Sequence, residues 1–142
     1  MIDPKTITNY NRTPAELQEW LLYCICVAGK RSEIETRKLD GFLQDEEYGL
    51  FERPFDLIYL LLHYDDHLWN GYTLGRLMQQ LQKHRIAPYQ QRYNSFSDVV
   101  RLLPDNLSHV TRNELEAVRG IGPKTSRFFL THSREDFTEP IL

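Results

Sequence analysis

The chain has 142 residues, 41% of them hydrophobic, and a formal net charge of −3 at pH 7. A chain of this length can bury one compact core, so we expect a single domain over residues 1–142. No secretory signal is recognisable, and the longest apolar runs, 20–28 and 55–62, are too short to span a bilayer. The sequence therefore predicts a soluble intracellular protein, in the cytoplasm, nucleoid or nucleus, with no membrane partner.

The first half of the chain carries three helix-start signals. A capping box at 13–16 begins a helix whose apolar residues recur at helical spacing up to Ala28. Ser32 with Glu35 repeats this signal for a second, more amphipathic helix. Pro54 opens a third helix, which is strongly apolar.

Two groups of side chains in this half could bind metals. Cys24 and Cys26 lie two residues apart on the first predicted helix and point to different sides, so we expect reduced core cysteines and no four-ligand cluster. His63 and His67 lie one turn apart beside Asp66, a spacing that can hold a divalent metal. The alternative is a polar helix end.

The middle of the chain predicts two further helices. Thr73 is expected to cap a helix that runs through Arg85. Pro88 breaks the pattern, and apolar residues from Tyr93 to Leu103 mark the next helix. Because no stretch alternates like a strand, we expect an all-α bundle of about seven short helices.

The last two helices are expected to meet at Gly120-Ile121-Gly122. A capping box at 111–114 begins the first of them, over about 112–118. The two glycines permit positive φ and a close backbone approach, while Ile121 can anchor the turn in the core. Pro123 suits the first position of the second helix, where no amide hydrogen is needed.

The start of this last helix is predicted to bind a phosphate. Its first turn presents unpaired N–H groups at the positive end of the helix dipole. Between Thr111 and Arg127 there are four basic residues and two acidic ones, although the whole chain is acidic. The candidate contacts are Arg119, Gly120, Gly122, Thr125, Ser126 and Arg127. The alternative is a tight turn between packed helices that binds nothing.

The run from Val118 to Ser126 resembles the hairpin of the helix-hairpin-helix DNA glycosylases of the endonuclease III and MutY type, which reads Leu-Pro-Gly-Val-Gly-x-Lys-Thr-Ala. Residues 86–94 are similar to the family's Ile-Gly-Leu-Tyr-Asn-x-Lys-Ala segment. Residues 17–32 lie where the family has an apolar helix ending in Gln-x-Thr-Asp. Together these matches span about 14–134. The resemblance implies a helix-hairpin-helix glycosylase-like bundle that binds duplex DNA.

The resemblance also implies chemistry. Lys124 stands where bifunctional members carry the lysine that attacks C1′ of the damaged nucleotide and forms a Schiff base, and the helix dipole there favours the free amine. The alternative is a lysine that contacts phosphate or solvent. The family's essential aspartate would follow roughly nineteen residues later, just beyond Leu142, and Asp136 comes too early to match it. We therefore expect either a fragment of a longer enzyme or a derivative without standard glycosylase chemistry.

Two further sites follow from the resemblance. Residues 89–92 are expected to form a polar, aromatic loop that enters the duplex, namely Tyr89, Gln90, Gln91 and Arg92. The alternative is a tyrosine packed on the core. A monovalent cation is expected at the backbone carbonyls of Glu116, Val118 and Ile121. No iron–sulfur cluster is expected, because two cysteines cannot supply four ligands.

The hairpin and the resemblance thus imply a DNA-binding protein of this superfamily, either a DNA N-glycosylase that can also cleave abasic sites through Lys124 or a fragment of such an enzyme. A catalytically inactive binding or interaction module is the first alternative. The second is an enzyme that acts on a modified base in DNA without excising it. No protein partner is predicted, and the acidic residues between 40 and 56 are expected to face away from DNA.

Overall fold

The computed structural model describes residues 2–28, 30–66 and 75–137, without the side chains of residues 64–66. These ranges contain seven α-helices, one 3-10 helix and no strand, which confirms the all-α prediction. No helix in these ranges is long and apolar enough to cross a membrane. The helices are α1 (Pro14–Val27), α2 (Ser32–Gln44), η1 (Glu46–Tyr48), α3 (Pro54–Asp66), α4 (Arg76–Lys83), α5 (Tyr89–Leu102), α6 (Arg112–Glu116) and α7 (Pro123–Ser133).

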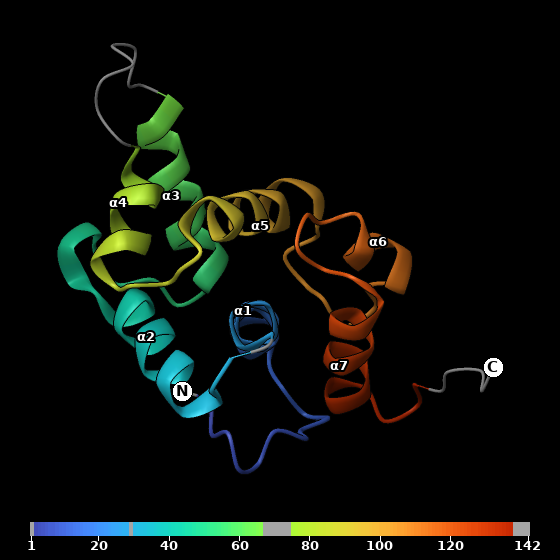
Figure 1. Ribbon diagram of the computed structural model, residues 1–142. Coiled ribbons are helices and arrows are strands. Elements are labelled where there is room, and N and C mark those ends of the chain that lie inside the picture. The colour runs from blue at the N-terminus through green and yellow to red at the C-terminus, as the bar shows by residue number, and fades with distance from the viewer. Residues whose placement is uncertain (1, 29, 67–74, 138–142) are drawn as a thin grey trace.

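Helix α1 is the centre of the fold. Figure 1 looks almost along this helix, with α2 to its left, α7 to its right and α5 above it. The expected capping box is present, because the Thr13 hydroxyl accepts from the Glu16 N–H at 3.2 Å and the Glu16 carboxylate accepts from the Thr13 N–H at 3.0 Å. All side chains from 20 to 26 are buried. A helix that is buried on every side has to lie inside the bundle.

Trp20 fixes α7 against α1. Its indole is fully buried, and its N–H donates to the Phe129 carbonyl at 3.1 Å. The Arg12 guanidinium lies 4.3 Å from the centre of the indole ring and donates to the His132 carbonyl at 2.9 Å. The N-terminal segment, α1 and α7 are therefore held together by one aromatic side chain and its polar neighbours.

The two cysteines are buried free thiols, as predicted. Burial raises the pKa of Cys26 to about 12 and that of Cys24 well above its usual value. Both thiols are therefore neutral at physiological pH and contribute to the fold as small apolar side chains.

Asp45 joins the end of α2 to α4. Its carboxylate accepts from Lys83 Nζ at 2.8 Å and lies 2.7 Å from His84 Nε2, and it also accepts the Glu47 N–H at 3.0 Å. These contacts, the Lys83 hydrogen bond first, hold the pKa of Asp45 well below its usual value. The carboxylate therefore stays ionised and links the two helices.

Helix α5 begins four residues earlier than expected, so residues 89–92 are its first turn and not a loop. Pro88 precedes the helix in an extended conformation, at φ −70° and ψ 130°. Proline ends a preceding helix, but its fixed φ is also suited to the position just before a new helix. This second property of Pro88 determines the start of α5.

Three other helix boundaries differ from the prediction. Ser32 is the first residue of α2 and not its cap, and its carbonyl accepts the Thr36 hydroxyl at 2.7 Å. Helix α4 begins only at Arg76, after Gly75, and Thr73 lies outside the described residues. Helix α6 ends at Glu116, because the chain tightens there into the turn that leads to the glycines.

Candidate nucleic-acid interface

Helices α6 and α7 form the expected hairpin. The capping box is present at its start, since the Thr111 hydroxyl accepts from the Glu114 N–H at 3.1 Å and the Glu114 carboxylate accepts from the Thr111 N–H at 2.9 Å. Leu115, Val118 and Ile121 are buried in the core, as expected for Ile121. These apolar side chains anchor the turn and leave the start of α7 at the surface.

The two glycines of the turn have different roles. Gly120 has a positive φ of +92°, and a Cβ there would lie 2.3 Å from the hydroxyl oxygen of Ser95. Gly122 is extended, at φ −95° and ψ −174°, and a Cβ there would meet no atom within 4 Å. Gly120 is therefore required by the backbone, whereas Gly122 leaves open space in front of the first turn of α7.

Helix α5 holds the turn through Arg119. The Ser95 hydroxyl donates to the Arg119 carbonyl at 2.6 Å, and Asp98 accepts the Arg119 backbone N–H at 3.0 Å. Asp98 also accepts the guanidinium through Nε at 2.9 Å and Nη2 at 3.0 Å, which lowers the pKa of this carboxyl. Arg119 was predicted to contact DNA; in the structure its charge is paired with Asp98.

A second polar contact joins α6 to α7. Glu116 accepts from Arg112 Nε at 2.6 Å and from the Ser126 hydroxyl at 2.8 Å. Arg112 and Ser126, in that order, lower the pKa of Glu116. Ser126 is fully buried, so the hydroxyl that was predicted to contact DNA instead closes the hairpin from within.

The first turn of α7 is largely exposed. Gly122 caps this helix without a side-chain hydrogen bond, so the N–H groups of Lys124 and Thr125 begin a helix whose N-terminus is open. Lys124 is exposed, Thr125 is half-buried, and Arg127 is exposed one turn further on. Of the six predicted contacts only Ser126 is buried; Thr125 is half-buried, and the other four are exposed, namely Arg119, Gly120, Gly122 and Arg127.

Lys124 also borders a pocket between α1 and α7. The pocket has a volume of about 230 Å³ and is lined by Lys124, Thr125, Phe128 and three residues near the end of α1, namely Cys24, Val27 and Ala28. Asp136, the nearest carboxylate to the family's aspartate position, lines a separate pocket beside Tyr10. The structure therefore places an amine, but not this carboxylate, at the pocket.

The predicted duplex-entering residues are only partly exposed. Gln90 and Gln91 are exposed, and Gln90 donates to the Asn94 side chain at 3.1 Å. Tyr89 is half-buried and packs against the core, which agrees with the alternative interpretation of this residue. Arg92 is buried, with 7% of its surface exposed.

The predicted metal ligands lie at the hairpin turn and at the end of α3. The Val118 carbonyl, one of the three proposed cation ligands, already accepts the Ile121 N–H at 3.1 Å. His63 is exposed, and His67 lies outside the described residues. Among the side chains of residues 2–28, 30–63 and 75–137, no three His, Cys, Asp or Glu residues are grouped so that they could hold a metal ion.

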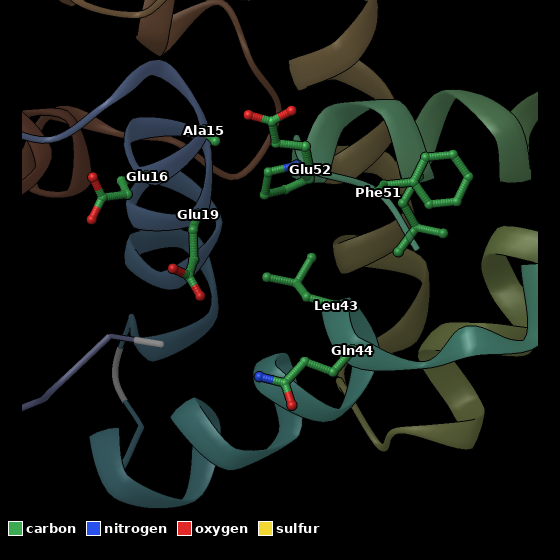
Figure 2. A pocket seen from close by; sticks show the side chains of 9 residues that line it. Ala15, Glu16, Glu19, Leu43, Gln44, Phe51 and Glu52 are labelled. Atoms are coloured by element: carbon green, nitrogen blue, oxygen red, sulfur yellow. The ribbon is translucent and has the colours of Figure 1, made fainter. Parts of the chain in front are cut away.

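A different pocket is partly acidic. Figure 2 shows side chains from α1, α2 and the segment before α3 around a cavity of about 240 Å³. Its walls include Glu16, Glu19 and Glu52 next to apolar Leu43 and Phe51. Carboxylates repel phosphate, so this region is a poor surface for DNA.

No protein-family model matches the chain, and no curated protein or solved structure matches it significantly. The helix-hairpin-helix resemblance therefore rests on the motif residues. The structure shows that the described ranges are all-helical.

We predict that Gly120→Ala lowers the free energy of unfolding by about 1–3 kcal/mol, because the new Cβ meets Ser95 and the backbone has a positive φ. Gly122→Ala is the matched control and should change stability by less than about 1 kcal/mol, because its Cβ meets open space. Urea denaturation followed by circular dichroism measures both values. Equal losses in the two variants would contradict this description of the turn.

Proposed function

We propose that the chain binds duplex DNA through the hairpin, as a helix-hairpin-helix domain of the DNA glycosylase type. In this proposal a backbone phosphate accepts hydrogen bonds from the N–H groups of Lys124 and Thr125, and the Lys124 ammonium adds a charge contact. The observation that carries the proposal is the uncapped start of α7 at Gly122, where no atom of the described residues lies within 4 Å of the position that a Cβ would occupy.

The rigidity of the turn supports this proposal. An anion site made of backbone amides needs these amides to be fixed before the ligand arrives. Ser95 and Asp98 on α5 hold Arg119, and Ile121 is buried. The N–H groups at the start of α7 are therefore oriented by the fold itself.

The proposed contact is independent of DNA sequence. Phosphate contacts fix the register of a protein on the duplex but do not distinguish bases. The acidic pocket lined by Glu16, Glu19 and Glu52 disfavours a competing mode of binding over α1 and α3. We therefore expect similar affinity for unrelated duplexes and strong dependence on salt.

We predict that Gly122→Ala weakens duplex binding roughly tenfold, because its Cβ occupies the space where the phosphate would lie. Lys124→Gln should lower the slope of log affinity against log salt by about 0.9. Fluorescence anisotropy with two duplexes of unrelated sequence, over a salt series, measures both effects. Arg37→Gln removes an exposed charge from α2 and is the control. Unchanged affinity and slope in both hairpin variants would refute the proposal.

A second function, cleavage at abasic sites, is favoured by the pocket beside Lys124. The pocket walls are largely apolar, with Val27 and Phe128 among them. A free amine can add to the C1′ aldehyde of a ring-opened abasic site and release water to give an imine. β-Elimination then transfers a C2′ proton to water and breaks the C3′–O bond, and the strand segment on the 3′ side leaves with its 5′-phosphate.

Excision of an intact base makes a further demand. It builds positive charge on the sugar, which a nearby carboxylate normally stabilises. Asp136 lines a different pocket from the one that Lys124 borders. The described residues therefore support lyase chemistry on an abasic site better than excision of a base.

We predict that borohydride reduction traps a covalent adduct between the chain and a duplex with one abasic site. Lys124→Gln should abolish this adduct, whereas Lys5→Gln, at an exposed lysine of the N-terminal segment, should retain it. Denaturing electrophoresis with a labelled strand measures the adduct. An adduct that persists in Lys124→Gln would assign the amine to another residue. Binding without any adduct would favour the inactive binding module.

A further inference from the structure

A second, cationic pocket lies beside the hairpin at the start of α5. It has a volume of about 490 Å³, and the residues around it come from the end of α1, the first turns of α5 and the hairpin turn. Three of its lining residues are basic and none is acidic; the polar ones are Lys30, Gln91, Arg92, Asn94 and Arg119. Gly122 and Lys124 do not line it, so it is distinct from the proposed duplex contact.

Arg92 is the unusual group in this pocket. More than nine-tenths of its surface is buried, and its Nε has no hydrogen-bond partner among the residues that the structure describes. A buried guanidinium N–H without an acceptor is costly, and a ligand that supplies the acceptor would recover this free energy. Arg92 lines the cavity, so its guanidinium charge lies beside any anion that enters it.

Lys30 adds a second charge that no carboxylate balances in the described part of the chain. Its ammonium donates to the Ala87 carbonyl, which brings it next to the start of α5. Arg119, by contrast, is paired with Asp98. The excess charge of the pocket thus comes from Lys30 and Arg92.

The start of α5 contributes in the same direction. This helix has 14 residues, and Pro88 at its N-cap makes no side-chain hydrogen bond to the first turn. Its N–H groups and dipole therefore favour an anion at the same end of the helix as Arg92. Two cations and a helix N-terminus thus converge on one recess.

We propose that this pocket binds a phosphate monoester, either the terminal phosphate of a DNA strand or the phosphate of a mononucleotide. A terminal phosphate is close to a dianion at neutral pH, which matches two unbalanced cations. A terminal phosphate carries a sugar on one side only, so it can enter the recess. A backbone diester carries a sugar on each side and would stay at the entrance of the recess. The cavity is larger than a phosphate needs, and Gln91 and Asn94 offer amide groups to the attached nucleoside.

Isothermal titration calorimetry with inorganic phosphate and with 2′-deoxyadenosine 5′-monophosphate tests this proposal without duplex DNA. The intact chain should bind the mononucleotide with a saturable isotherm and inorganic phosphate more weakly. Lys30→Gln should weaken mononucleotide binding roughly tenfold. Arg37→Gln, which removes the same charge from the exposed surface of α2, should leave it unchanged. Because Lys30 is exposed, its variant should fold even where Arg92→Gln does not.

A nicked duplex with a phosphate or a hydroxyl at the 5′ side of the nick distinguishes the two sources of the phosphate. Tighter binding of the phosphorylated nick, lost in Lys30→Gln, assigns the pocket to strand ends. Saturable mononucleotide binding with equal affinity for both nicks assigns it to free nucleotides. Absence of saturable binding by every phosphate probe, or equal affinity in Lys30→Gln and Arg37→Gln, would overturn the proposal. Failure to bind an unbroken duplex bears only on the hairpin.

Discussion

The candidate interface depends on the hydrogen bonds between α5 and Arg119. Ser95 fixes the Arg119 carbonyl, and Asp98 fixes its N–H and its guanidinium. These hydrogen bonds hold α5 so close to the turn that there is no room for a side chain at position 120. With the turn fixed on one side by α5 and on the other by buried Ile121, α7 begins at a defined place with its first N–H groups outward. The proposed anion contact at Gly122 depends on this arrangement.

Charge is distributed so that an acidic chain still presents cationic surfaces. Several basic side chains near the hairpin are paired within the fold, as Arg119 is with Asp98 and Arg112 with Glu116. Lys30 and Arg92 line a pocket with no carboxylate among its lining residues, whereas the pocket of Figure 2 is lined by Glu16, Glu19 and Glu52. Binding of nucleic acid is therefore expected to depend on a few positions and not on net charge.

Local patterns in the sequence were enough to predict most of the fold. The capping boxes at Thr13 and Thr111 are present because each involves residues three positions apart. The turn at the hairpin was likewise visible in its glycines. The roles of individual polar residues were not predictable, because burial is decided by contacts between distant segments. The Ser126 hydroxyl is used in the contact between α6 and α7. Asp98 forms hydrogen bonds with Arg119, 21 positions away, and no spacing rule indicates such a pair.

The most direct test of the central claim is a two-dimensional amide NMR titration of the chain with a short undamaged duplex. The account predicts the largest shift changes at the amides of Gly122, Lys124 and Thr125, with little change around Glu16 and Glu52. These changes should be the same for a duplex of unrelated sequence, because the contact is to phosphate. Shift changes centred on α2 and α3, or none at the start of α7 under conditions where the duplex binds, would contradict the account.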